Sequence, residues 1–326
     1  MNTKLKKFLI VNIAIILVIC VIAEIAAFYS YRNRYSELIS NQANLLDNPQ
    51  EVIKENTPHY LFPRKFDYSI FEKRMKFRIF KTENPKKRPI VTIGCSYTEG
   101  AGLENNQTFA SKLNKLTGRT TYNRGISGTG PQLVYRQLID KDFKKDVPDA
   151  EYVIYTFIHH HLYRQFQTML CSYTSEINLQ YSLKNGKLTE KSHPFWFMYW
   201  SFLLKTYFEY KTNVLYGQEF SQDLPMFLCF LKNSVDKMHE LYPDSKFVLV
   251  EFPQSDLCLD NYEEGMYELT PENIKMIEDL GIIYINASKL VGHRFCEKKY
   301  RLPDNDHPSE TTWDELTPKI VEKLGL

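Results

Sequence analysis

Three side chains in this sequence have the types and spacing needed for nucleophilic acyl transfer: Ser96, Asp304 and His307. A serine hydroxyl is a weak nucleophile until a base takes its proton, and a carboxylate commonly orients that base. Asp304 and His307 are close enough in sequence for one tight loop to carry both. We therefore expect Ser96 to act as nucleophile, His307 as base and Asp304 as the partner of His307. The alternative is a surface loop whose polar residues only cap the following helix, with Ser309 at the cap.

The residues around Ser96 predict a turn at the exit of a buried strand. Residues 89–93 form a short apolar run rich in β-branched side chains, which is typical of a strand inside a sheet. Gly94 precedes the serine, and Gly100 and Gly102 follow it. Backbone N–H groups in such a turn can face a negative charge that develops on a substrate. Small residues at a strand exit also occur in turns that have no catalytic role.

Three separated blocks of the sequence resemble those of the SGNH or GDSL-type hydrolases. They are Gly94-Cys95-Ser96-Tyr97-Thr98-Glu99-Gly100, Asn123-Arg124-Gly125-Ile126-Ser127-Gly128, and the Asp-x-x-His-Pro block from Asp304 to Pro308. Their order and spacing agree with the family pattern. The resemblance covers roughly residues 88–170 and 245–326.

The resemblance implies a fold, a reaction and roles for individual residues. The fold is expected to be an α/β, flavodoxin-like three-layer sandwich around a parallel sheet of roughly five strands. The reaction is expected to be acyl transfer from an ester through Ser96, His307 and Asp304. The backbone N–H groups of Ser96 and Gly128 are expected to bind the oxyanion.

The sequence departs from the family pattern in two places. Cys95 stands where the family usually has an aspartate, at a position that transfers no proton. The third block usually supplies an asparagine that donates to the oxyanion, whereas here the chain reads His159-His160-His161. We expect one of these imidazoles to be the donor. Strand alternation would put His159 and His161 on one face and His160 on the other, and which of them faces Ser96 stays open.

The rest of the pattern predicts alternating strands and helices, as in a parallel sheet covered on both faces. Further strands are expected at residues 121–123, 152–158, 247–252 and 282–285, and helices at residues 108–116, 131–143, 224–241 and 271–280 and after Ser309. Right-handed crossovers bring the carboxyl ends of all these strands to one edge of the sheet. The predicted catalytic and oxyanion residues should therefore meet at that edge.

We predict three regions within the 326 residues. A cytoplasmic tip and transmembrane helix take residues 1–30, a stalk with a short hairpin takes residues 31–87, and the hydrolase domain takes residues 88–326. An aromatic-rich insertion lies at about residues 162–223. It is either a lid or substrate wall that touches the bilayer, or a buried helical hairpin that enlarges the core, and aromatic residues at helical spacing slightly favour the hairpin.

The N-terminal segment predicts a membrane anchor. Residues 8–29 are apolar except for Asn12 and Glu24, which is enough length at helical rise to cross the hydrocarbon of a bilayer. Three lysines precede the run, so the positive-inside rule places the N-terminus in the cytoplasm and the catalytic domain outside it. We therefore expect a single-pass membrane protein with the lipid bilayer as a partner. A cleaved signal peptide is the alternative, but no Ala-x-Ala site follows the apolar core.

The net charge and the spacing of the histidines bear on two further kinds of partner, nucleic acids and metal ions. Lysine plus arginine total 41 against 39 acidic residues, and a net charge of +2 gives no argument for nucleic acid. The three histidines invite a zinc hypothesis, but adjacent residues on a strand converge poorly on one ion, and no His-Glu-x-x-His pattern is present. We expect neither a metal nor another cofactor.

The predicted compartment would permit disulfides among Cys171, Cys229, Cys258 and Cys296. Cys258 and Cys296 both follow expected strands near the proposed active edge, so they are the first candidates for a pair. Unpaired, buried thiols are an equally good interpretation.

The sequence thus predicts a membrane-anchored serine ester hydrolase, with O-acetyl esters of envelope carbohydrate as a plausible substrate. If a sugar hydroxyl replaces water as the acceptor, the same site is an O-acyltransferase. A protein of another class is the remaining alternative, namely a catalytically silent binding or assembly protein that keeps the fold. The altered third block favours that alternative.

Overall fold

The structure is a computed structural model. It describes residues 11–13, 15, 16, 18–27, 29, 77–83, 87–127, 129–164, 181–184, 187–190, 224–253, 269–293, 295–303 and 307–326. The chain divides into two compact units. The first comprises Met1–Lys76, Thr168–Asn178 and Ser192–Gln218, and the second comprises Phe77–Gln167, Leu179–Lys191 and Glu219–Leu326.

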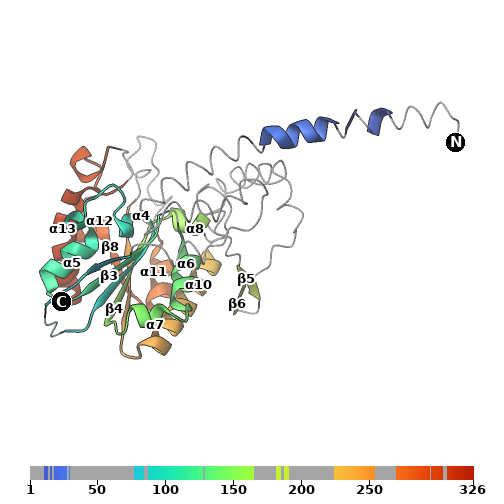
Figure 1. The fold of residues 1–326 in the computed structure, drawn as a ribbon. Helices are drawn as coiled ribbons and strands as arrows, with labels where there is room; N and C mark the ends of the chain where they lie inside the picture. Colours follow the sequence, from blue (N-terminus) through green and yellow to red (C-terminus); the bar gives the residue numbers. More distant parts are fainter. Residues whose placement is uncertain are drawn as a thin grey trace. The chain divides into compact units, whose positions relative to one another are not determined.

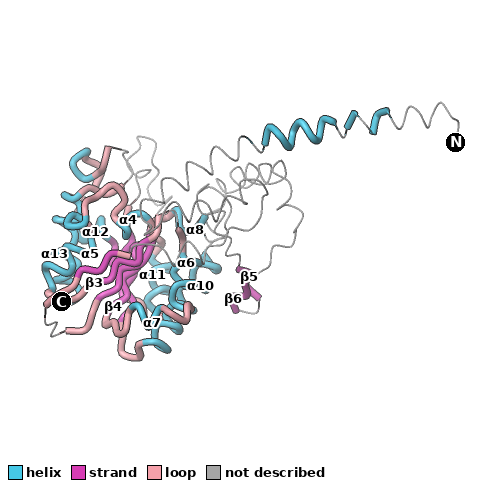
Figure 2. The backbone as a smooth tube through the Cα atoms, viewed as in Figure 1, coloured by secondary structure: helices cyan, strands magenta, loops and turns pink. Residues whose placement is uncertain are grey.

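A six-stranded sheet forms the centre of the second unit (Figures 1 and 2). Its order is β1-β3-β2-β4-β7-β8. The strands are β1 (Arg78–Phe80), β2 (Ile90–Gly94), β3 (Thr121–Gly125), β4 (Tyr152–Phe157), β7 (Lys246–Glu251) and β8 (Ile283–Asn286). β1 runs antiparallel to β3, whereas the other pairs are parallel. The parallel strands have the flavodoxin-like order, which confirms the predicted α/β architecture.

Helices cover both faces of this sheet (Figure 1). One face carries α6 (Pro131–Leu138), α7 (Phe143–Asp146), α10 (Leu224–Leu241) and α11 (Pro271–Glu278), and the other carries α5 (Phe109–Thr117), α12 (Ala287–Val291) and α13 (Glu310–Leu324). Alternate side chains of β4 enter the two cores, with Val153 and Tyr155 on the first face and Tyr152 and Ile154 on the second. The second unit is therefore a three-layer sandwich.

Most predicted elements have the expected type and place, and one helix differs. The segment expected as one helix over residues 131–143 is two helices, α6 and α7. The Asp140 side chain accepts a hydrogen bond from Asp142 N at 2.8 Å and thereby supports a turn between them. α10 has the predicted bounds, Leu224–Leu241.

Two features fall in the regions predicted as stalk and insertion. β1 lies in the predicted stalk and extends the sheet at its β3 edge. In the insertion, β5 (Tyr181–Lys184) and β6 (Lys187–Glu190) form a two-stranded antiparallel sheet. The aromatic run at residues 193–210 lies outside the described residues.

The first unit is described only within residues 11–29, where the described residues are helical. The large apolar side chains of this helix are exposed, from 48% at Ile13 to 61% at Ile22. In the part of the chain that the structure describes, every helix falls short of the length or the apolarity that a bilayer span requires.

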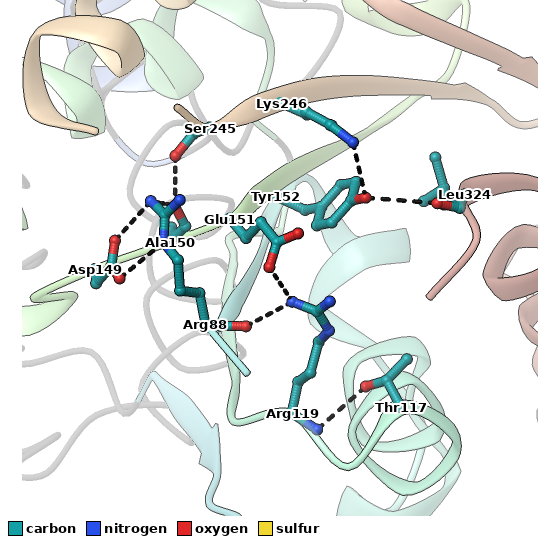
Figure 3. A network of polar contacts seen from close by, with 10 residues as sticks. All are labelled: Arg88, Thr117, Arg119, Asp149, Ala150, Glu151, Tyr152, Ser245, Lys246 and Leu324. Carbon is teal, nitrogen blue, oxygen red and sulfur yellow. Dashed lines mark hydrogen bonds and ion pairs between the residues drawn. The ribbon is translucent and has the colours of Figure 1, made fainter. Parts of the chain in front are cut away.

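A network of polar contacts fastens the amino ends of the strands (Figure 3). Arg119 follows α5 and donates to Arg88 O at 2.9 Å, and it pairs with Glu151 at 2.5 Å. Arg88 forms a two-pronged contact with Asp149, with both distances 2.8 Å. These residues join the start of β2 to the start of β4, at the opposite end of the strands from Ser96.

We predict that Arg119→Met destabilises the fold, because it leaves the Glu151 carboxylate and a backbone carbonyl without their donor. The free energy of unfolding in urea should fall by about 1–3 kcal/mol. Lys275→Met is the control, since its pair with Asp279 is solvent-exposed and should contribute less than about 0.5 kcal/mol. Equal losses in the two variants would contradict the structural role of Arg119.

Candidate active site

Ser96 lies in a tight turn at the carboxyl end of β2. It is the first residue of α4 (Ser96–Glu99), a single helical turn with Cys95 at the N-cap position. Gly94 has φ +148°, and a Cβ at that position would lie 2.4 Å from Thr98 Oγ1. The turn therefore requires glycine two residues before Ser96. Because β2 lies between β3 and β4, this turn stands where the strand order reverses, which is the usual ligand-binding edge of such sheets.

His307 comes to Ser96 from the loop before α13. Its Nε2 lies 2.9 Å from Ser96 Oγ. The loop is closed at its base, because Arg301 and Pro308 form a β-bridge and Leu302 N donates to His307 O at 2.9 Å. When the imidazole is neutral, the Ser96 hydroxyl can donate to Nε2, which is the geometry that a general base needs.

Two predicted site residues lie outside the described residues: Asp304, the expected partner of His307, and Gly128, an expected oxyanion donor. Their roles stay predictions. The N–H of Ser96, the other expected backbone donor, stands at the start of α4, where a helical amide has no intrahelical partner.

The three histidines do not alternate along a strand, so that prediction is wrong. β4 ends at Phe157, the chain turns at His159, and His160 begins α8 (His160–Arg164). Backbone hydrogen bonds close this turn, since His161 N donates to Ile158 O at 2.8 Å and Leu162 N donates to His159 O at 2.9 Å. Both α4 and α8 follow parallel strands that end at the same edge of the sheet (Figure 1).

The surroundings of the histidines differ. His159 is 1% exposed and donates from Nε2 to Glu251 Oε1 at 2.8 Å. His161 is fully buried, with Nδ1 2.6 Å from Tyr155 OH. Burial lowers the pKa of His161 well below its usual value and raises that of Tyr155, so the phenol donates to a neutral imidazole. His160 is partly exposed.

Glu251 is a buried carboxylate that the sequence analysis missed. It ends β7 and accepts hydrogen bonds from His159, Leu269 N at 3.2 Å, Asn286 Nδ2 at 3.0 Å and Tyr284 OH. Burial by itself raises the pKa of Glu251, but the bonds from His159, Tyr284 and Leu269 outweigh it and lower that pKa. The sequence feature that could have identified Glu251 is its position as an acidic residue after four apolar residues at the carboxyl end of β7.

Glu99 is a second buried carboxylate that the sequence analysis did not single out. It ends α4 and is 6% exposed. Its Oε2 accepts from Ser127 N at 2.6 Å and from Ser127 Oγ at 2.5 Å. Burial raises the pKa of Glu99, against the effect of the two Ser127 donors.

The described cysteines differ in whether they form a disulfide. Cys296, upstream of the His307 loop, is disulfide-bonded. Cys258 and Cys171 lie outside the described residues, so the pairing of Cys296 with Cys258 stays a prediction. Cys229, one of the candidates for a disulfide, is a reduced thiol, as is Cys95 beside the nucleophile. Within the described ranges, no three histidine, cysteine or acidic side chains are placed to hold a metal ion.

The solved structures that resemble this chain include lipolytic proteins and carbohydrate esterases. A chain described as a lipolytic protein of the G-D-S-L family from Desulfitobacterium hafniense is 12% identical, with a TM-score of 0.40, and the match covers 72% of this chain and 99% of that one. A family two carbohydrate esterase from Clostridium thermocellum is 13% identical, with a TM-score of 0.43 and coverage of 76% and 68%. The acetylxylan esterase Axe2 from Geobacillus stearothermophilus is 12% identical, with a TM-score of 0.42 and coverage of 74% and 96%. No protein-family model and no curated protein matches the sequence.

We predict that Glu251→Gln destabilises the fold in a pH-dependent way. The pKa of Glu251 is lowered by folding, so its contribution to stability is present above the ordinary carboxyl pKa and is lost as pH falls through the folded value. At pH 7 the variant should lose about 2–4 kcal/mol of unfolding free energy. The difference from the parent protein should shrink below about pH 4.

Urea unfolding at both pH values measures this effect. Glu278→Gln is the matched control, because Glu278 is exposed on α11 and should change stability little at either pH. A loss that is the same at both pH values would show that the charge of Glu251 contributes nothing.

Proposed function

We propose that this chain is a serine ester hydrolase of the SGNH type that forms an acyl-enzyme on Ser96. The observation that carries the proposal is the 2.9 Å contact between Ser96 Oγ and His307 Nε2. The positions of these side chains also support it, because Ser96 follows β2 at the point where the strand order reverses. A catalytically silent binding protein would not need a serine hydroxyl held against an imidazole.

The proposed reaction has two steps. His307 Nε2 takes the proton of Ser96 while Oγ bonds to the ester carbonyl carbon, and the carbonyl electrons move onto oxygen. The tetrahedral intermediate collapses, and the alcohol leaves with the proton from His307. Water then attacks the acyl-enzyme with His307 again as base. The second tetrahedral intermediate collapses, the acid is released, and His307 returns the proton to Ser96 Oγ. Asp304 is proposed to orient His307 and to stabilise its charged form.

The oxyanion is proposed to bind the N–H groups of Ser96 and Gly128 and one imidazole, for which we choose His160. A donor to the oxyanion has to contact the substrate. His159 is 1% exposed and His161 is fully buried, whereas His160 is partly exposed. These differences support His160 over its neighbours.

We propose that the enzyme is anchored in the membrane through the whole apolar run of residues 8–29, which is longer than the described part of its helix, with the N-terminus in the cytoplasm and the catalytic domain outside it. The exposed aliphatic side chains of the helix within residues 11–29 support a lipid environment for this segment. An enzyme in that location would meet envelope carbohydrate, so O-acetyl esters of sugars are the proposed substrates. If a sugar hydroxyl takes the place of water in the second step, the enzyme is an O-acyltransferase.

We predict that Ser96→Ala abolishes turnover of an activated acetyl ester, because the variant has no hydroxyl for His307 to activate. The value of kcat should fall by at least about 1,000-fold, with an unchanged circular dichroism spectrum. Ser111→Ala is the control, since Ser111 lies on α5, is not one of the proposed catalytic residues and should leave kcat unchanged. Retained turnover in Ser96→Ala would rule out the proposal and direct attention to Cys95.

We predict that His160→Ala and His161→Ala fail in different ways. His160→Ala should lower kcat about 100- to 1,000-fold, as expected for a lost oxyanion donor, and should change stability little. His161→Ala should lower the unfolding free energy by about 1–3 kcal/mol, because it removes the partner of the buried Tyr155 hydroxyl. Steady-state kinetics measures kcat for both variants, and urea unfolding measures their free energies of unfolding. Normal kcat in His160→Ala would exclude this histidine as the donor.

A further inference from the structure

Glu99 is a buried carboxylate beside the proposed nucleophile that the Ser96–His307 pair does not use. Ser96 and Glu99 are the first and last residues of α4. A buried carboxylate is costly unless hydrogen bonds compensate for its lost hydration. Burial raises the pKa of Glu99, while the hydrogen bonds from Ser127 and the charges of Arg78 and His307 act in the opposite direction.

The compensating donors come from one residue of the loop between β3 and α6. Ser127 N and Ser127 Oγ both donate to Glu99 Oε2, at 2.6 and 2.5 Å. A carboxylate that accepts a backbone N–H and a side-chain O–H from the same residue restrains both the position and the orientation of that residue. The loop is therefore attached to α4 through Ser127.

The same loop is attached to the end of β2. Ile126 N donates to Gly94 O at 2.8 Å, and Thr129 Oγ1 donates to Ile126 O at 2.7 Å and lies 3.2 Å from Gly94 O. These contacts flank Ser127 and place the loop beside the turn that carries Ser96. Without the Glu99 carboxylate, the flanks of the loop would stay attached while Ser127 lost the contacts of its N–H and hydroxyl with this group.

The backbone of Glu99 is itself held closely against β3. A Cβ added to Gly125 would lie 2.2 Å from Glu99 N, so only glycine permits this approach. Asn123 Nδ2 donates to Glu99 O at 3.2 Å and Arg78 Nη1 donates to the same oxygen at 3.0 Å. Because its backbone is fixed in this way, the Glu99 carboxylate has little freedom to follow a loop that moves.

We infer that Glu99 is a positioning residue for the proposed reaction: its carboxylate fixes Ser127, and thereby the loop between β3 and α6, against the nucleophile turn. This inference rests on the proposed function, in which that loop supplies an oxyanion donor. An oxyanion exists only in the transition state and the tetrahedral intermediate. Loss of the restraint should therefore lower kcat and leave KM nearly unchanged.

The test compares Glu99→Ala, Glu99→Gln and Ser127→Ala in the full chain, with a soluble activated acetyl ester as substrate. Glu99→Ala removes the acceptor and should lower kcat about 100-fold, with KM within about 2-fold of the parent value. Glu99→Gln keeps an acceptor oxygen and should restore part of the loss. Ser127→Ala keeps the backbone N–H contact, so its kcat should fall about 10-fold.

A double variant separates positioning from general destabilisation. Glu99→Ala with Ser127→Ala should have the same kcat as Glu99→Ala alone, because both changes remove one shared interaction. Glu278→Gln, on the exposed face of α11, is the control that should leave kcat unchanged. Each kcat is divided by the fraction of folded protein, which urea unfolding measures. A loss of stability is then not counted as a loss of catalysis.

The inference is overturned if Glu99→Gln and Ser127→Ala keep the parent kcat, or if the losses in the double variant simply multiply. These two milder variants decide the question even if Glu99→Ala fails to fold. A failure of the proposed function gives a different result, in which Ser96→Ala itself keeps turnover. A Glu99 variant with normal kcat beside an inactive Ser96→Ala would refute only the positioning role.

Discussion

The contact between Ser96 Oγ and His307 Nε2 is the interaction on which the functional account depends. The two residues are far apart in the sequence, so the fold has to bring them together. Ser96 is fixed by the turn after β2, whereas His307 is carried on the loop before α13. The first residue of α13, Glu310, accepts from Lys112 Nζ at 2.8 Å and from Gln107 Nε2 at 2.9 Å. These contacts join α13, which follows His307, to the segment that follows Ser96. They therefore help to hold the imidazole and the serine in a fixed relative position.

The two buried carboxylates at this edge of the sheet show how the number of hydrogen-bond donors affects a carboxyl pKa. Both are desolvated, yet the pKa of Glu99 is raised and that of Glu251 is lowered. Glu251 accepts from several groups on three segments, including the His159 imidazole, whereas the described hydrogen bonds to the Glu99 carboxylate come from Ser127 alone. Glu251 therefore stabilises the fold as an anion. The Glu99 carboxylate accepts fewer described hydrogen bonds, but its backbone is fixed against β3. It can therefore restrain the loop that carries Ser127.

The sequence was sufficient for the parts that local patterns control. Short apolar runs predicted most of the parallel strands, and the resemblance to the SGNH hydrolases implied their flavodoxin-like arrangement. The meeting of Ser96 with His307 was predictable because both stand beside the carboxyl edge of that sheet. The path of the histidines was not, because β4 ends at Phe157 and the turn that follows depends on buried partners far along the chain, such as Glu251 for His159. Tertiary hydrogen bonds of this kind leave no periodic pattern in the sequence.

Covalent labelling by a serine-reactive fluorophosphonate tests the central claim most directly, because the reagent reports an activated hydroxyl without requiring knowledge of the natural substrate. The account predicts one phosphonylated residue, Ser96, identified by mass spectrometry of the full chain. It also predicts that His307→Ala slows this labelling at least about 100-fold, since the base that takes the proton is missing. Absence of the adduct in the folded protein, or labelling of Ser96 at the same rate with and without His307, would contradict the account.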